Sequence, residues 1–319
     1  MIVSDKLKFV LKRQRDDHIL FRKEVEKIFG EDYHRLTKPN SFYSALLVLL
    51  DISIIVAGYA LIFVDIVSPV IQIIVASILI GNRQRALMNL LHESSHSNLF
   101  NSKSLSKIVI RHFIAPLLFV DIDTYKKSHI AHHKNAGIEG LDGNLMHTPQ
   151  KEKSLKSVFL KLLFDKKIFP FILLGYAINC PMAGKIKMFL WWSVFGIFLS
   201  SLFGVKFFGI FILMWYFARI FVYHPLTVFR EILDHIGLLP GTISEYTRNI
   251  ISNSYTKMFF HPHNNGYHLL HHYVQEIPYH NLPKAHNMLI KKSEYYRNMI
   301  HLNSYFFGQN SAIAHFKND

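Results

Sequence analysis

Long apolar segments without basic residues alternate with charged segments along this chain. Residues 39–82 contain no Lys or Arg, and their only acidic residues are Asp51 and Asp65. At about 1.5 Å rise per residue, this stretch can form two helices of roughly 20 residues, each long enough to cross a bilayer core about 30 Å thick. The pattern predicts a first transmembrane hairpin within residues 41–90, with its turn near Pro69.

A second apolar block covers residues 188–222 and is interrupted by Lys206. It predicts another hairpin, whose arms reach spanning length only if they extend over the wider range 184–229. Residues 168–182 are also apolar, but their prolines and modest length favour an interfacial or re-entrant helix over a span.

Positive charge is concentrated on one side of these hairpins. Residues 1–40 hold ten Lys and Arg, and they lack the apolar run of a cleavable signal peptide. Residues 151–167 form a second basic stretch, whereas the two outer turns carry only Lys206. Because cytosolic loops of membrane proteins are enriched in Lys and Arg, we expect both termini on the cytosolic side.

We therefore predict an all-α integral membrane protein, with four transmembrane helices in two hairpins and a cytosolic helical cap. The whole chain, residues 1–319, is expected to form one domain. Its parts in order are a cytosolic N-terminal segment (1–40), the first hairpin (41–90), a cytosolic part with the interfacial helix (91–183), the second hairpin (184–229) and a cytosolic C-terminal part (230–319).

The composition of the chain limits the kinds of partner and the kinds of metal site that it can have. Lys and Arg outnumber Asp and Glu by 36 to 22, and because half of the chain is hydrophobic, we assign this excess to a membrane surface or an acidic protein partner rather than to nucleic acid. The single cysteine, Cys180, excludes an internal disulfide and a thiolate-ligated metal site made by this chain alone. Neither membrane insertion nor basicity accounts for twenty histidines.

Eight histidines lie in three short motifs within the segments predicted to be cytosolic. The motifs are His92-Glu93-Ser94-Ser95-His96, His129-Ile130-Ala131-His132-His133 and His268-Leu269-Leu270-His271-His272. Spacings of three and four residues share one helix face, so each trio is expected to offer its imidazoles to a common centre. One zinc ion needs three or four ligands, so eight imidazoles indicate two metal ions. A nitrogen-rich site of this kind suits iron and the reduction of dioxygen.

The third motif resembles the third histidine box of the membrane fatty-acid desaturases. The similar segment runs from Asn264 through His272 and continues at Ile277-Pro278-Tyr279-His280. The first two motifs match in order, and the segment ending in Asp234-His235 resembles the extra histidine that many members carry after the fourth span. The resemblance covers roughly residues 40–290, and it departs from the family where Gln275 replaces a proline.

This resemblance implies a membrane-bound di-iron oxidase that uses O2 and two external electrons to desaturate a fatty acyl or other lipid chain. The implied iron ligands, which are also the implied catalytic residues, are His92, His96, His129, His132, His133, His235, His268, His271 and His272. Since no haem-binding or flavin-binding domain is recognised, we expect a separate ferredoxin or small cytochrome with its reductase to dock on the basic face. We expect the bacterial inner membrane rather than the endoplasmic reticulum.

Other polar residues are expected around the irons. The resemblance implies a water-mediated iron contact for Asn264, whose alternative role is to shape a turn. A carboxylate at Asp142 could orient the second ring nitrogen of a ligand, but the sequence favours a surface turn for this residue. Glu93, Tyr125 and Asp234 are candidates for the same orienting role. Histidines without a motif are expected to be ordinary polar or interfacial residues, among them His112, His147, His224, His261, His263 and His280.

Other classes of protein remain open at this point. Lipid hydroxylases and carotenoid hydroxylases or ketolases have closely similar boxes. An intramembrane zinc protease shares the H-E-x-x-H pattern of residues 92–96, in which Glu93 would be the general base. In such proteases, however, the later aspartate belongs to a span, whereas Asp142 lies in a polar segment and six clustered histidines would have no role. A membrane receptor or metal carrier would bind metal without consuming oxygen.

Overall fold

Helices make up nearly all of the regular structure. The computed structural model describes residues 5–64, 66–143, 155–238, 241–252 and 255–317. Within these ranges the only strands are β1 (Asn249–Ile250) and β2 (His301–Leu302), which pair in parallel over two residues each. The predicted all-α class is therefore confirmed for this part of the chain.

The first hairpin consists of α3 (Ser41–Leu61) and α4 (Pro69–Ser95). α3 begins where the side chain of Asn40 accepts a hydrogen bond from the backbone N–H of Tyr43 at 3.0 Å, an ordinary N-terminal cap. α4 begins at Pro69, whose fixed φ suits the first position of a helix. Its last turn carries His92, so this helix runs from the apolar end of the molecule to the first histidine motif.

The second hairpin consists of α10 (Met182–Phe203) and a longer helical arm that begins after Gly204. This arm comprises α11 (Val205–Ala218), the π-helical turn η3 (Arg219–Tyr223) and α12 (His224–Asp234). Pro225 has no N–H to donate to the carbonyl of Phe221, and the helix widens at this point. The arm ends directly before His235.

Among the described residues, three helical stretches are long and apolar enough to cross a membrane, namely Asp32–Leu61, Met182–Phe203 and Val205–Asp234. The arms of the second hairpin thus extend over the length that the sequence-based prediction required. α4 does not meet the same condition, because the polar run Asn82-Arg83-Gln84-Arg85 lies near its middle. A membrane span at α4 stays a prediction.

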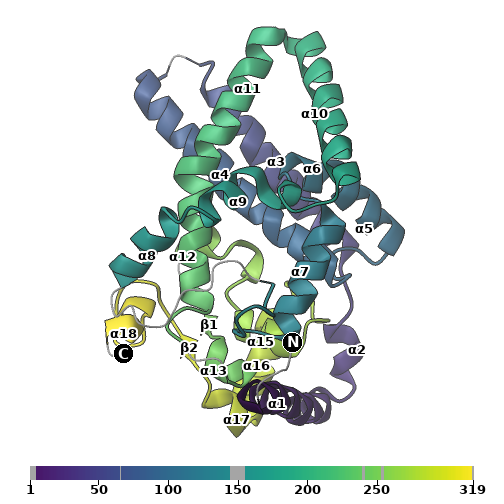
Figure 1. Cartoon of the computed structure of the whole chain (residues 1–319), viewed down its shortest axis with the longest axis vertical. Coiled ribbons are helices and arrows are strands. Elements are labelled where there is room, and N and C mark those ends of the chain that lie inside the picture. The colour runs from purple at the N-terminus through teal and green to yellow at the C-terminus, as the bar shows by residue number, and fades with distance from the viewer. Residues whose placement is uncertain (1–4, 65, 144–154, 239–240, 253–254, 318–319) are drawn as a thin grey trace.

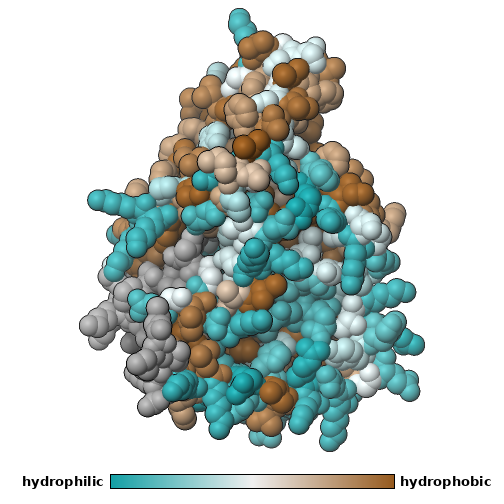
Figure 2. Space-filling model, turned by 45° about the vertical axis from the view of Figure 1, so that its right-hand side comes forward, coloured by the Kyte–Doolittle hydropathy of each residue, from teal (hydrophilic) through white to brown (hydrophobic). Residues whose placement is uncertain are grey.

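The apolar residues of both hairpins are largely exposed. Leu49, Phe189, Val194, Ile197 and Leu213 each expose more than half of their surface. Figure 2 shows hydrophobic residues covering the end of the molecule that holds the hairpins, and hydrophilic residues covering the opposite end. An exposed apolar surface of this extent is typical of contact with lipid.

The polar run of α4 is buried against protein. A Cβ added at Gly81 would lie 2.6 Å from the carbonyl oxygen of Ala218, so only glycine permits this approach of α4 to the second hairpin. Gln84 donates a hydrogen bond to the carbonyl of Trp215 at 3.0 Å. Arg83 forms an ion pair of 2.9 Å with the buried Asp51 of α3, which ties the two arms of the first hairpin together.

The histidine motifs of the polar end lie on α7 (Ile122–Lys134) and α15 (His268–Tyr273). α1 (Asp5–Phe29) packs against α15, where the Tyr273 hydroxyl donates a hydrogen bond to Asp17 at 2.7 Å. The first and last described helices both lie at this polar end of the molecule (Figure 1). The remaining elements are α2 (Asp32–Leu36), α5 (Lys103–Val109), η1 (Ile110–Ile114), α6 (Ala115–Leu117), α8 (Leu155–Leu163), α9 (Ile168–Leu174), η2 (Gly175–Ala177), α13 (Ile243–Tyr246), α14 (Thr256–Phe260), η4 (Pro262–Asn264), α16 (Leu282–Lys292), α17 (Glu294–Arg297) and α18 (Ala312–Lys317).

The segment expected to be an interfacial helix folds as the short apolar stretch Ile168–Ala177. It consists of α9 followed by η2 and is too short to cross a membrane core about 30 Å thick. Its place at the membrane surface stays a prediction.

The buried ion pair between Asp51 and Arg83 generates a first prediction. The carboxylate of Asp51 contacts both Arg83 and His263. Asp51→Leu removes this shared partner, so we expect the free energy of unfolding to fall by about 3–5 kcal/mol. A lower midpoint of thermal unfolding in detergent measures this loss. The double variant D51L/R83M should regain part of this loss. Asp123→Asn breaks an exposed pair with Arg111 and should cost about 1 kcal/mol or less. An unchanged midpoint in D51L would contradict the assignment.

Candidate metal centre

The structure brings all nine predicted histidines together in two groups. The first group contains His92, His96, His129, His133 and His271, and the second contains His132, His235, His268 and His272. Within each group, one ring nitrogen from every member lies within 4.8 Å of those of the others. Each group therefore collects its members from three separate segments, as a metal site does.

The two motifs with three histidines are each divided between the groups. In α7, His129 and His133 belong to the first group and His132 to the second. In α15 the pattern is reversed, because the two histidines four residues apart belong to the second group and His271 to the first. The expectation that each trio serves one common centre is therefore wrong. On a helix, the side chains at i and i+4 lie nearly above one another, so they reach the same group. The side chain at i+3 projects to one side of this pair and reaches the other group.

Local interactions fix the helices that carry these side chains. α7 begins at Asp121, whose carboxylate accepts the backbone N–H of Thr124 at 2.9 Å. The chain before α15 is joined to β1 by a hydrogen bond of 2.8 Å from the N–H of Ile250 to the carbonyl of Gly266. A Cβ at Gly266 would lie 2.3 Å from the Ile250 carbonyl oxygen, so this contact requires glycine.

The ring nitrogens face one another at distances that suit shared metal ions. The Nε2–Nε2 distances are 2.7 Å for His96–His129, 3.0 Å for His129–His133, 2.8 Å for His235–His268 and 3.1 Å for His268–His272. Two imidazole nitrogens that bind one ion at about 2.1 Å each, at right angles, lie about 3 Å apart. The spacing in both groups therefore fits metal coordination.

Unpartnered nitrogens support the same conclusion. Both ring nitrogens of His271 and Nε2 of His92 are buried without a hydrogen-bond partner among the described residues. Buried polar atoms in proteins nearly always have a partner, and a metal ion would supply the missing one here. The residues present thus fit a pair of metal ions.

The rings are held in the form that binds metals. Burial, and secondarily the neighbouring His272, keeps the pKa of His133 well below its ordinary value. Burial, with a smaller contribution from Lys126, lowers the pKa of His96 to about 4. These imidazoles are therefore neutral near pH 7 and offer a nitrogen lone pair, which metal binding requires.

Outer partners orient several of the rings. Asp142 Oδ1 lies 2.8 Å from His132 Nδ1, and its other oxygen accepts the N–H of Gly137 at 2.7 Å. His235 Nδ1 donates to the carbonyl of Tyr246 at 3.1 Å. When Nδ1 carries the proton, Nε2 is left free to bind a metal. For Asp142 the sequence favoured a surface turn, and the contact with His132 supports the orienting role instead.

The other expected outer residues also lie beside the rings. The Tyr125 ring stacks on His129, with centroids 5.5 Å apart. Glu93 lies 3.4 Å from His92 Nδ1 and accepts the N–H of Tyr279 at 3.1 Å. Asp234 forms an ion pair with Arg230 and lies 3.9 Å from His268 Nδ1.

Two histidines expected to be ordinary polar residues make buried hydrogen-bond contacts with carboxylates. His261 lies 3.2 Å from Asp234, and His263 lies 2.8 Å from Asp51. No motif marks either residue in the sequence. His224 contacts the carbonyl of Leu163, His112 is exposed, His280 is partly exposed, and His147 lies outside the described residues.

The contacts and the backbone of Asn264 place it in a turn. Its amide donates a hydrogen bond to the carbonyl of Tyr279 at 3.0 Å, and its backbone φ is 57°. Both features agree with the shaping of a turn. Its role as a water-mediated iron contact stays a prediction.

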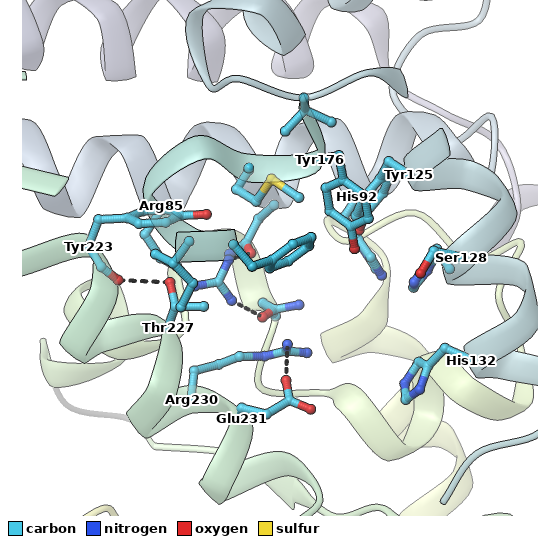
Figure 3. Close-up of a pocket in the computed structure, with 18 of the residues that line it drawn as sticks. Arg85, His92, Tyr125, Ser128, His132, Tyr176, Tyr223, Thr227, Arg230 and Glu231 are labelled. Carbon is cyan, nitrogen blue, oxygen red and sulfur yellow. Dashed lines mark hydrogen bonds and ion pairs between the residues drawn. The ribbon is translucent and has the colours of Figure 1, made fainter. Parts of the chain in front are cut away.

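A cavity of about 130 Å³ borders both histidine groups. His92 and His129 of the first group line it, together with His132 and His268 of the second. Figure 3 shows Arg230 and Glu231 on one side of this cavity and Ser128 and His132 on the other. Its other lining residues are Arg85, Met88, Asn89, Val120, Tyr125, Gly143, Phe171, Ile172, Gly175, Tyr176, Arg219, Tyr223, Thr227 and Asn265. Arg85 and Arg219 had no assigned role in the sequence-based site.

The model of the family described as fatty acid desaturase matches residues 68–303, which is most of the chain. The chain belongs to the fatty acid desaturase family. The matched range of this desaturase family member contains all nine histidines, and membership implies an oxidoreductase. The two histidine groups fit the di-iron desaturases and hydroxylases of this superfamily. A comparison with curated proteins finds no match.

The contact between Asp142 and His132 generates a second prediction for this family member. Asp142→Ala removes the partner that orients His132, so we expect the metal affinity of the second group to fall about 10- to 100-fold. Iron retained after dialysis against a graded series of chelator concentrations measures this loss. Asp123→Ala, a change at an exposed acid, is the matched control and should retain iron as the unmodified protein does. Equal retention in both variants would rule out an orienting role for Asp142.

Proposed function

We propose that the chain is a membrane-bound di-iron oxidase that uses O2 and two external electrons to desaturate a fatty acyl or other lipid chain. The observation that carries this proposal is the pair of adjacent histidine groups, each with enough nitrogens for one metal ion. When bound, two irons would supply the reduction of O2 and the removal of hydrogen from an unactivated methylene. The nine histidines of the two groups would hold them.

The side chains around the groups support iron chemistry of this kind. The nine proposed ligands are imidazoles rather than carboxylates, so they would leave the charge of the metal ions largely uncancelled. Asp142 and the carbonyl of Tyr246 hold Nδ1 protons and turn Nε2 of His132 and His235 inward. These contacts would keep the ligands in place while the oxidation state of the metals changes.

The proposed topology has four spans, in which α4 is the second along the chain and is added to the three long apolar stretches. Its polar residues contact protein rather than lipid, as the Arg83–Asp51 ion pair illustrates, and a buried partner lowers the cost of a charge at membrane depth. α4 and the arm that ends at α12 both run from the apolar end to the histidines. We place the metal centre on the cytosolic side of a bacterial inner membrane, because the basic segments of the chain lie at this end.

The proposed domain division follows from this topology. Hairpins within residues 41–90 and 184–229 would lie in the membrane, and the parts 1–40, 91–183 and 230–319 would lie in the cytosol. A ferredoxin or small cytochrome with its reductase would deliver the electrons to this face. Nothing in the proposal involves nucleic acid.

The intramembrane zinc protease is a weaker explanation of the same residues. His92 and His96 share their group with three further histidines, and a protease zinc would leave the second group without a role. Glu93, the general base in that scheme, accepts a hydrogen bond from the backbone of Tyr279.

Lipid profiling of a host that expresses the chain tests the proposed reaction. We expect new unsaturated acyl chains with the unmodified protein, and a loss of at least about 100-fold in His132→Ala and His271→Ala, because each change removes a ligand from a different group. His112→Ala, at an exposed histidine outside both groups, is the matched control and should retain activity.

The products also separate the alternatives. Hydroxylated or ketolated products would assign the chain to the hydroxylases or ketolases of the same superfamily. Undiminished lipid oxidation in both histidine variants would contradict the di-iron proposal.

A further inference from the structure

Three arginines line the cavity beside the metal centre, and they differ in how their charge is balanced. Arg230 pairs with Asp234 and with Glu231, the latter at 3.0 Å. Arg85 and Arg219 have no carboxylate at ion-pair distance among the described residues. The lining of the cavity therefore carries positive charge that the neighbouring acids do not cancel.

Both of these guanidinium groups are buried and bonded only to neutral acceptors. Arg85 is 4% exposed and donates to the side-chain oxygens of Asn89 and Asn265, the latter at 3.1 Å. Arg219 is 1% exposed and donates to the carbonyls of Ile172 at 2.7 Å and Leu118 at 3.2 Å. Within the described part of the chain, neither buried guanidinium group is therefore paired with a carboxylate at ion-pair distance.

Each guanidinium group also keeps one buried N–H unused. Nε of Arg85 and Nη1 of Arg219 have no hydrogen-bond partner among the described residues. Burial of a charge is costly unless it is paired, and a buried N–H without an acceptor adds to that cost. An anion with oxygen acceptors would relieve both costs, because guanidinium groups bind carboxylate and phosphate through charge-assisted hydrogen bonds.

We propose that this cavity binds the substrate through an oxyanion group, a carboxylate or a phosphate, held by Arg85 and Arg219. The inference rests on the proposed function for the identity of the substrate, but the binding site follows from the arginines alone. Because His92, His129, His132 and His268 line the same space, the anionic end of the substrate would lie near the metal centre. The substrate class is then an acyl or alkyl chain with a free anionic group, rather than a neutral hydrocarbon.

Binding of three probes with the same chain length tests this inference. The probes are palmitate, hexadecyl phosphate and hexadecanol, added to the purified full chain in detergent, both iron-loaded and metal-free. Probe-dependent shifts in the midpoint of thermal unfolding give each dissociation constant. We expect at least one anionic probe to bind about 10- to 100-fold more tightly than hexadecanol, which is the usual effect of a charged hydrogen bond. Preference between the two anionic probes identifies the oxyanion.

Substitutions then locate the site. Arg85→Gln and Arg219→Gln should each remove most of the preference for the anionic probe and leave hexadecanol binding unchanged. Arg85→Lys keeps the charge and should keep part of the preference, which separates loss of the site from loss of the fold. Arg111→Gln, at an arginine paired with Asp123 outside the cavity, is the matched control.

The inference is overturned if hexadecanol binds as tightly as both anionic probes, or if neither glutamine variant changes the preference. Its failure is distinct from a failure of the proposed function. A preference that persists in protein without lipid-oxidising activity would refute the function and leave the oxyanion site in place. Lipid oxidation without any preference for an anionic probe would refute the oxyanion site and leave the proposed function in place.

Discussion

Eight buried imidazoles and the partly buried ring of His96 turn their nitrogens toward one another, and this is the constraint on which the structure depends. A neutral imidazole that donates its Nδ1 proton to an outer acceptor, as His132 and His235 do, has only an acceptor nitrogen left at Nε2. Acceptor nitrogens that face one another cannot satisfy each other. Two metal ions would resolve the conflict, because each would accept several lone pairs at the observed spacing of about 3 Å. The helices, their outer partners and the cavity are all arranged around these two points.

Several helices carry their histidines at or near one end, and these ends meet at the two histidine groups. α4 and the arm through α12 deliver His92 and His235, while α7 and α15 each divide their histidines between the groups. Buried polar contacts hold these helices in register. Of these, the Arg83–Asp51 ion pair lies within the first hairpin, and the contact of Asp17 with Tyr273 fixes α1 over α15. The polar residues of α4 are thus part of the support of the site.

The sequence was sufficient to predict the helical class and the eight histidines of the three motifs, because apolar length and spacing within one helix are local properties. His235 lies in no such motif and was predicted only from the resemblance to the desaturase family. It did not predict contacts between distant segments. The pairing of His263 with Asp51 joins residues 212 positions apart, and nothing in either local sequence indicates it. The division of each trio also depends on where the neighbouring helices lie. Arg85 and Arg219 were counted only as charges, since their lack of a counter-ion is a property of the packed interior.

Iron analysis combined with X-ray absorption spectroscopy of purified, active protein tests the central claim most directly. The account predicts two irons per chain, each surrounded mainly by imidazole nitrogen. A single bound zinc, or active protein without iron in this stoichiometry, would contradict it.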